Sequence, residues 1–338
     1  MLRALASAIA LACAMPAAAQ SLPYDELFVF GDSLVDSGNA QIGSLLMGLP
    51  DPAPTTAGYF QGRFSNGPNF ADDLSGLLGN GLATASLAGG TNFAFGGAQA
   101  REQVGDRSPS FAEQLGMFAM SGRSIDANDL VLVTLGGNDI RSVVRDTGTV
   151  DFTETLTAMR TGLLALIGAG AESIVITGLP DIGRIPATRL VALQEMDPSI
   201  ITLATQRSEF LNTAFAALAD NLSMLTGADV EFFDLLALQR AVEADPAAFG
   251  LLADLNTTSF CQAGGPSAVL GGCEGYLYFD PVHPTRQVHA VIAGAIAEQI
   301  AAAPVPEPAA WLFLIGGFGA VGGALRVRRA GTGAPAAA

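Results

Sequence analysis

Lysine is absent from this chain of 338 residues, and all 16 basic residues are arginines. Enzymes that form a Schiff base on a lysine amine are therefore excluded, pyridoxal phosphate enzymes and lysine aldolases among them. The 32 acidic residues outnumber the basic ones and give a formal net charge of -16. Because nucleic-acid binding needs a basic surface that displaces counterions from phosphates, a nucleic-acid partner is excluded too.

Histidine is nearly as scarce, with 2 residues in the whole chain. This leaves too few nitrogen and sulfur ligands for a zinc hydrolase, so we expect neither a metal nor another cofactor. The G-x-S-x-G turn that carries the nucleophile of conventional α/β-hydrolases does not occur in the sequence. Metal-dependent and conventional α/β-hydrolase chemistry are therefore both disfavoured.

Cysteine occurs at 3 positions, of which Cys13 lies in the N-terminal segment. The other two, Cys261 and Cys273, lie in a glycine-rich stretch. In an exported chain, two cysteines this close in sequence favour a disulfide. Two packed free thiols are the alternative.

The N-terminal segment has the pattern of an export signal. Met1 to Arg3 give a positive start, Ala4 to Met15 an apolar core and Ala17 to Ala19 a small-residue cleavage site. We therefore expect residues 1–19 to be a signal peptide and the mature chain to begin at Gln20.

The C-terminal segment has three parts in a fixed order. Val305-Pro306-Glu307-Pro308 precedes the apolar run Ala309 to Leu325, and the arginine-rich stretch Arg326 to Arg329 follows it. The apolar run reaches the short end of what crosses a bilayer. Trp311 at one edge and the arginines at the other suit interface anchoring, with the arginines on the cytoplasmic side.

This order resembles the bacterial PEP-CTERM sorting signal, which implies recognition and processing by an exosortase. We expect the signal at residues 304–329, with a transmembrane helix at 309–325 and a tail at 330–338. A plain membrane anchor is the alternative. The protein is then expected in the cell envelope or outside the cell, held by this helix transiently or permanently.

Residues 20–303 are predicted to form one domain, since 50% of the chain is apolar and only 14% is charged. Short apolar runs that favour strands alternate with segments of helical spacing. The strand-like runs are Leu27 to Phe30, Thr91 to Phe95, Leu130 to Leu135, Ser173 to Thr177 and Val230 to Phe233, and the clearest helical segments are Phe152 to Gly168, Ser199 to Leu225 and Thr285 to Ala302. This alternation predicts an α/β fold, a three-layer α/β/α sandwich around a parallel sheet. Residues 40–68 are expected to form a long loop over the functional edge of the sheet.

Four stretches fall at or near that edge, because right-handed crossovers bring the C-terminal ends of parallel strands together. Ser33 follows the first strand, and the glycine-rich stretch at 89–98 contains the second strand and its end. Asn138 lies in a G-G-N-D sequence, and Asp280 precedes His283 in D-P-V-H. They supply a hydroxyl that can attack, an amide donor and an imidazole next to a carboxylate. The glycines supply backbone that can come close to an oxyanion. These are the components of acyl transfer.

These stretches, in this order, resemble the GDSL esterases and lipases of the SGNH hydrolase superfamily. The sequences F-G-D-S-L-x-D-S-G-N, R-F-S-N-G and N-F-A-x-G-G-A look most like its plant-type and secreted bacterial branch. The resemblance covers about residues 25–302 and implies a flavodoxin-like sheet.

The resemblance also implies the roles of the site residues. Ser33 is the expected nucleophile, His283 its base and Asp280 the triad acid. The backbone N–H groups of Ser33 and Gly97, with the Asn138 side chain, are the expected oxyanion hole. The implied activity is hydrolysis of acyl esters of lipids or of acylated carbohydrates through an acyl-enzyme. An acyltransferase of the same fold, or an envelope protein that binds without catalysis, is the alternative.

Four nearby polar residues are expected to support the site without chemistry of their own. Asp36 and Asn39 are expected to brace the turn after Ser33, and Asp139 to support Asn138. His289 is expected to be a packed or surface histidine.

Overall fold

The computed structural model describes residues 22–103, 105 and 107–302. Its central sheet has four parallel strands in the order of the sequence, β1 (Leu27–Gly31), β2 (Leu130–Thr134), β3 (Ser173–Thr177) and β4 (Asp229–Phe233). Every residue of β1 and β2 is buried, as expected for parallel strands covered on both faces. The core therefore lies along these two strands, at whose ends Ser33 and Asn138 follow.

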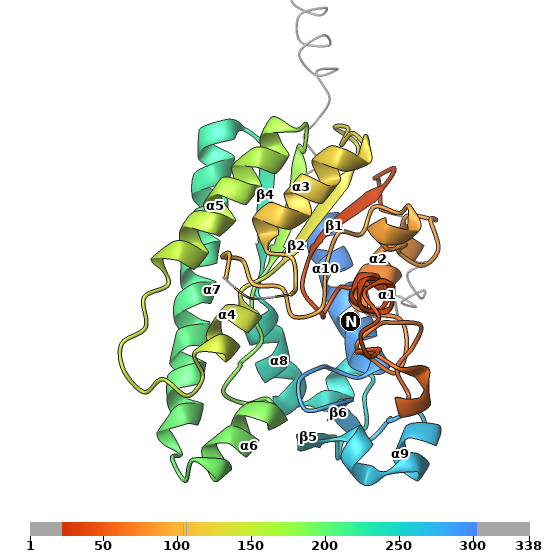
Figure 1. The fold of residues 1–338 in the computed structure, drawn as a ribbon, viewed down its shortest axis with the longest axis vertical. Coiled ribbons are helices and arrows are strands. Elements are labelled where there is room, and N and C mark those ends of the chain that lie inside the picture. The colour runs from red at the N-terminus through yellow and green to blue at the C-terminus, as the bar shows by residue number, and fades with distance from the viewer. Residues whose placement is uncertain (1–21, 104, 106, 303–338) are drawn as a thin grey trace, which may run out of the picture. The chain divides into compact units, whose positions relative to one another are not determined.

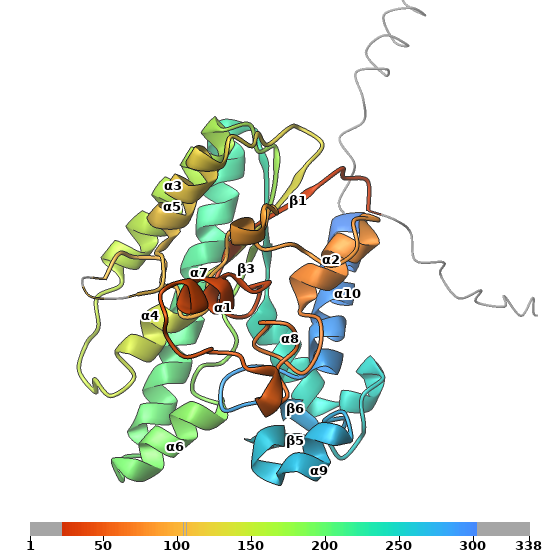
Figure 2. The same ribbon diagram turned by 45° about the vertical axis from the view of Figure 1, so that its right-hand side comes forward.

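Helices cover both faces of this sheet, as the two views show (Figures 1 and 2). On one face lie α3 (Phe111–Ser121), α5 (Thr153–Gly168) and α7 (Ser199–Thr226), and on the other lie α2 (Phe70–Leu77), α8 (Leu235–Ala244) and α10 (Arg286–Ala302). The predicted three-layer α/β/α sandwich is confirmed. Within the described residues, no helix is long and apolar enough to cross a membrane. The predicted segments 1–19, 304–329 and 330–338 lie outside the described residues.

Shorter elements lie mostly in the connections. They are α1 (Asn39–Leu46), η1 (Thr55–Ala57), η2 (Ser86–Ala88), α4 (Gly137–Ser142), α6 (Pro186–Gln194), η3 (Pro246–Phe249), η4 (Cys261–Gly264) and α9 (Pro266–Leu270), with β5 (Asn256–Phe260) and β6 (Tyr276–Tyr278) as a separate parallel pair. The prediction of a continuous loop at 40–68 is wrong at its start, where α1 lies. The reason is local: the Asp36 carboxylate accepts hydrogen bonds from the N–H groups of Asn39 and Ala40 and so stabilises the start of that helix.

The segment Thr91 to Phe95 is not a regular strand, contrary to the prediction. It does lie beside β1, since the N–H of Phe93 donates to Val29 O at 2.7 Å and that of Phe95 to Gly31 O at 3.0 Å. On its outer side, the Asn39 side chain binds the carbonyls of Asn92 and Ala94 where a further strand would have to pair. The N–H of Ser86 also donates to Asn92 O there, so among the described residues the outer side forms one isolated bridge, between Ala85 and Asn92, and no strand.

The position of this segment nevertheless sets the topology. It pairs with β1 through odd-numbered residues such as Val29, while even-numbered positions such as Glu26 and Asp32 bond to β2. After β1, the chain thus first places the segment Thr91 to Phe95 on one side of β1 and then places β2 on the other side. In doubly wound sheets of this flavodoxin-like order, ligands bind where the direction reverses, at the C-terminal end of the first strand.

The predicted disulfide between Cys261 and Cys273 is present, with a Cα–Cα distance of 5.5 Å. Both cysteines are buried with Phe279 in a small cluster that also contains Tyr59. Closing so short a loop contributes about 3 kcal/mol of stability in the chain-entropy estimate. The bridge therefore stabilises the segment immediately before Asp280.

Candidate active site

Ser33 lies in a tight turn immediately after β1. A Cβ on Gly31 would come within 2.6 Å of the Val35 side chain and 2.7 Å of Thr134 O, so only glycine fits at the end of this strand. The N–H groups of Val35 and Asp36 both bond to Asp32 O and close the turn. Ser33 is thereby held at the edge of the sheet with its side chain largely buried.

Two hydrogen bonds connect Ser33, His283 and Asp280. Nε2 of His283 lies 2.7 Å from Oγ of Ser33, and Nδ1 lies 2.7 Å from Oδ2 of Asp280. Because Nδ1 faces a carboxylate, it carries the ring proton and leaves Nε2 free to accept one. Ser33, which lies 250 positions from His283, thus joins His283 and Asp280 in one continuous chain from hydroxyl to carboxylate.

The Asp280 carboxylate is stabilised from several directions. Its Oδ1 accepts the N–H groups of Val282 and His283, both at 2.8 Å. Burial alone would raise the pKa of Asp280, but the His283 side chain and these hydrogen bonds outweigh it and hold the pKa below its usual value. Asp280 therefore stays ionised beside the imidazole.

Tyr59 is a third partner of Asp280 that the sequence did not reveal. Its hydroxyl donates to Oδ2 at 2.8 Å, the same oxygen that faces His283. Its ring packs edge-on against Phe279, with ring centroids 5.0 Å apart. Burial and the neighbouring Asp280 raise the pKa of the Tyr59 hydroxyl, so it remains a donor at ordinary pH. Tyr59 thus helps to fix the carboxylate oxygen that His283 also contacts.

Gly97 lies in the left-handed region, with φ of 87°, and a Cβ there would meet Ser108 Oγ at 2.7 Å. The preceding peptide is held at both ends, because Gly96 N–H donates to Asp36 Oδ2 at 2.8 Å and Ser108 Oγ donates to Gly96 O at 2.7 Å. Among the described residues, no acceptor bonds to the N–H of Gly97 or of Ser33. Both groups are therefore available to a ligand.

Asp36 joins the Ser33 turn to this glycine segment. Besides Gly96, its carboxylate accepts N–H groups from Gly38, Asn39 and Ala40 at 2.7 to 3.1 Å. Burial raises the pKa of Asp36 to about 6, although these four hydrogen bonds favour the charged form. The expectation that Asp36 braces this turn agrees with these contacts.

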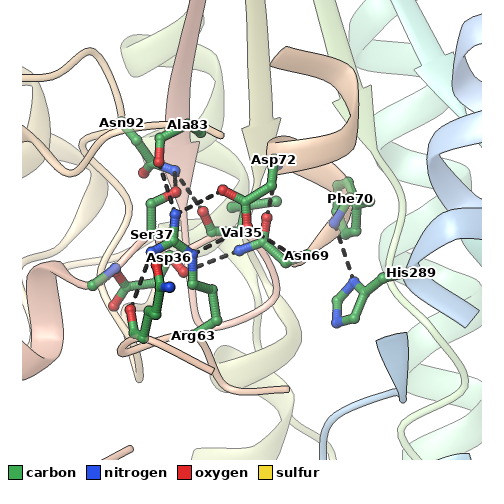
Figure 3. Close-up of polar contacts among 12 residues, drawn as sticks. Val35, Asp36, Ser37, Arg63, Asn69, Phe70, Asp72, Ala83, Asn92 and His289 are labelled. Atoms are coloured by element: carbon green, nitrogen blue, oxygen red, sulfur yellow. Dashed lines mark hydrogen bonds and ion pairs between the residues drawn. The ribbon is translucent and has the colours of Figure 1, made fainter. Parts of the chain in front are cut away.

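The R-F-S-N-G sequence contributes Arg63 to a neighbouring polar network (Figure 3). The Arg63 guanidinium donates to both carboxylate oxygens of Asp72 and to Ala83 O. Asn69 caps α2 and donates to Asp36 O at 3.0 Å. The network therefore ties α2 to the segment that follows Ser33.

His289 belongs to the same region and has no part in the hydroxyl-to-carboxylate chain. Its Nδ1 accepts the N–H of Phe70 at 3.3 Å, and the two rings pack with centroids 5.7 Å apart (Figure 3). Burial, and to a lesser extent the charges of His283 and Arg286, lowers the pKa of His289 to about 3. It is a neutral, packed histidine, as expected.

Asn138 lies in the first turn of α4, which follows β2 through Gly136 with φ of 108°. Its Nδ2 donates to Ala98 O at 2.9 Å and lies 3.5 Å from Asp32 Oδ2. Its Oδ1 accepts from Arg141 Nη1 at 2.9 Å. The amide is therefore oriented with its NH₂ group toward the Ser33 side.

Asp139, expected to support Asn138, makes no direct bond to the Asn138 side chain. Its carboxylate accepts from Ala100 N and from Thr155 Oγ1, at 2.9 and 2.8 Å, and so fixes the loop after Gly97 to α5. The orienting residue is Arg141, one turn along α4, which no motif marked.

A cleft of about 530 Å³ opens beside the reacting side chains. Its polar wall contains Ser33, His283 and Arg141, together with the Gly97 backbone. Its apolar wall is formed by Met47, Leu49, Pro50, Pro52, Phe64 and Phe95. A second, narrow cavity of about 30 Å³ lies against Ser33, Asn138 and Arg141 and is otherwise lined mainly by apolar side chains.

This arrangement has the parts needed for nucleophilic attack on a carbonyl. An imidazole that can accept a proton touches the hydroxyl, and free N–H donors lie around it to stabilise an oxyanion. Within the described part of the chain, no group of three or more histidines, cysteines or carboxylates could hold a metal ion.

Comparisons with known proteins agree with this chemistry. The family model of GDSL-like lipases and acylhydrolases matches residues 27–296. The chain is 30% identical to esterase EstA of Pseudomonas aeruginosa over 82% of its own length and 47% of EstA. It is 26% identical to the phosphatidylcholine-sterol acyltransferase of Aeromonas hydrophila, covering 82% of this chain and 90% of that enzyme.

A third relative, lipase 1 of Photorhabdus luminescens, is 29% identical over 52% of this chain. The chain spans only a quarter of the length of that lipase (25%) and about half of EstA (47%). The family model, in contrast, covers most of the chain, from β1 well into α10. The chain therefore belongs to the GDSL-like lipase/acylhydrolase family of carboxylic ester hydrolases.

Proposed function

We propose that this chain cleaves esters through an acyl-enzyme formed on Ser33. The main support for this proposal is the continuous chain of hydrogen bonds from Ser33 through His283 to Asp280, in which each bond is 2.7 Å long. His283 takes the proton of Ser33 as the hydroxyl oxygen attacks the ester carbonyl, and then gives it to the leaving alcohol. Asp280 holds the ring tautomer and stabilises the imidazolium. Water, activated by the same histidine, then releases the acid.

The negative charge that develops on the carbonyl oxygen is stabilised by three donors. These are the free N–H groups of Ser33 and Gly97 and the side-chain NH₂ of Asn138. Preorganised donors are worth most when they need not move during the reaction. The Ser108 bond to Gly96 O, in the peptide that carries the Gly97 N–H, and the Arg141 bond to Asn138 support this role, since each fixes the orientation of one donor.

The substrate we propose is an acyl ester of a lipid or of an acylated carbohydrate. The apolar wall of the cleft, with Met47, Leu49 and Phe95, supports an acyl group of some length. Transfer of the acyl group to an acceptor other than water is a second candidate, supported by the relative that is named as an acyltransferase.

Replacing the nucleophile or its base tests this mechanism. We expect Ser33→Ala and His283→Ala each to lower kcat for a short-chain chromogenic ester by about 10³ or more, with little further loss in the double variant, because the two groups act as one unit. Steady-state kinetics of the three variants measure this.

The matched control is Ser121→Ala, which removes a serine hydroxyl bonded to Phe118 O at the end of α3. We expect this variant to keep its activity. Substantial turnover by a folded Ser33→Ala variant would contradict the proposed mechanism.

Tyr59→Phe tests whether Tyr59 positions Asp280. Without the hydroxyl, more of the negative charge of Oδ2 faces His283, which favours the protonated imidazole. Since only the neutral imidazole can act as base, we expect the acidic limb of the kcat/KM–pH profile to move to higher pH, with kcat only modestly reduced.

Tyr276→Phe is the matched control, because Tyr276 packs in the same cluster as Tyr59 and has no bond to Asp280. An unshifted profile in Tyr59→Phe, or an equal shift in Tyr276→Phe, would show that Tyr59 serves packing alone.

We further propose that the chain is exported and sorted through its C-terminal segment. The signal-like pattern at 1–19 and the Pro-Glu-Pro, apolar and basic order at 304–329 support this. The Cys261–Cys273 bridge supports an oxidising compartment. The F-G-D-S-L-x-D-S-G-N block supports the plant-type and secreted bacterial branch of the family.

Peptide mapping of the mature protein from its own cells tests this sorting. We expect an N-terminus at Gln20 and a C-terminus near Pro306 to Pro308, with the catalytic domain (20–303) left outside. Recovery of an intact peptide from Ala309 to Arg326 would indicate a permanent anchor instead of processing. Recovery of residues 1–19 would contradict export by this signal.

A further inference from the structure

Arg141 lies where the two cavities beside Ser33 meet. It is in the wall of both the 530 Å³ cleft and the narrow 30 Å³ cavity, and among the described residues Ser33 is the only other residue that lines both. Its place on α4, one turn after Asn138, brings the guanidinium to the C-terminal edge of the sheet. A positive charge is thus built into the wall of the reaction site.

The Arg141 guanidinium has few partners. A guanidinium carries five N–H donors, and Arg141 uses Nη1 for Asn138 Oδ1. Within the described residues, no other acceptor bonds to it and no carboxylate lies within ion-pair distance. Other arginines of this part of the chain do form ion pairs: Arg63, Arg101, Arg123, Arg145, Arg184, Arg240 and Arg286. Arg141 therefore keeps donors free in the cavity wall next to Ser33.

Nearby carboxylates do not neutralise this charge by direct contact. Asp32 and Asp280 act on Arg141 only through space. The Asp32 carboxyl bonds instead to Leu34 N–H at 3.0 Å, and that of Asp280 to Tyr59 and His283. Burial lowers the pKa of Arg141, which shows that the guanidinium is costly to keep charged there without an anionic partner.

We propose that Arg141 binds an anionic group of the substrate, a carboxylate or a phosphate, next to the ester that Ser33 attacks. This inference rests on the proposed ester-hydrolase function and narrows its substrate class to anionic esters. A guanidinium fork matches the oxygens of carboxylate and phosphate groups and forms charge-assisted hydrogen bonds with them. The apolar wall with Met47 and Leu49 then receives the uncharged part of the same molecule.

The net charge of the chain makes such a site selective. At -16, the protein repels anions over most of its surface. An anionic ester is therefore bound only where a local positive charge overcomes this repulsion. Arg141 supplies that charge at the point where the ester must lie.

Matched ester pairs test the proposal. The first pair is 4-acetoxybenzoate and its methyl ester, which differ by a carboxylate on the alcohol side of the ester. The second pair is mono-4-nitrophenyl adipate and 4-nitrophenyl hexanoate, which differ by a carboxylate on the acyl side. In wild type, we expect kcat/KM to favour the anionic member of one pair. In Arg141→Gln, this anionic-to-neutral ratio should fall about tenfold or more, as expected for hydrogen bonds to a charged group.

The neutral ester itself is expected to be cleaved more slowly by Arg141→Gln, because the bond to Asn138 is altered. The ratio is therefore the readout, and Arg145→Gln is the matched control. Arg145 carries the same charge on the exposed surface, where it pairs with Glu195, so its removal should leave the ratio unchanged. In the wild type, the anionic-to-neutral ratio should also fall as the sodium chloride concentration is raised, because salt screens the charge of Arg141.

Vesicles separate the two sources of the anionic group. Preferential cleavage of phosphatidic acid over diacylglycerol, lost in Arg141→Gln, identifies a lipid phosphate, and a preference confined to the soluble pairs identifies a carboxylate. An unchanged ratio in Arg141→Gln, with both esters slowed equally, would overturn the proposal and leave Arg141 as a positioning residue for Asn138. If wild type cleaved none of these esters, the proposed ester hydrolysis itself would fail.

Discussion

The arrangement of the site depends on the hydrogen bonds that the Asp36 carboxylate accepts. This carboxylate accepts the N–H groups of Gly38, Asn39 and Ala40, which begin α1, and that of Gly96, which precedes Gly97. One buried side chain thus joins the turn that carries Ser33 to the segment that carries Gly97. Because a buried carboxylate without these partners costs several kcal/mol, the two segments are held together whenever the domain is folded.

The Asp280 carboxylate is likewise bound at both oxygens. Tyr59 and His283 share one oxygen, and backbone N–H groups donate to the other. The disulfide stabilises the segment just before it. Ser33, His283 and Asp280 therefore lie in loops, and each loop is fixed by buried polar contacts. This is the condition under which a static arrangement of donors can lower a barrier.

The sequence predicted the parts of the molecule that depend on local pattern. The strands β1 to β4 and the long helices α5, α7 and α10 were found because apolar periodicity is a property of the segment itself. Ser33, Asn138 and His283 stood out because each lies in a motif at the end of such an element. The segment Thr91 to Phe95 has the composition of a strand, but its composition does not show that the Asn39 side chain binds its outer carbonyls.

Tyr59 and Arg141 could not be found in this way. Tyr59 is separated from Asp280 by 221 positions, and nothing near it in the sequence marks it. Arg141 is one arginine among 16, and only its position in the cavity wall distinguishes it from those that pair on the surface. The role of Tyr59 follows from a contact between distant segments, and that of Arg141 from its place in the cavity wall, neither of which residue pattern alone encodes.

Covalent trapping of the nucleophile tests the central claim most directly. The protein is treated with a fluorophosphonate reagent, which reacts with a serine activated by a neighbouring imidazole, and the tryptic peptide that ends at Arg63 is sequenced by mass spectrometry. The account predicts one adduct, on Ser33, that is lost in His283→Ala. An esterase that is inactivated by the reagent while the adduct lies on another serine would contradict it.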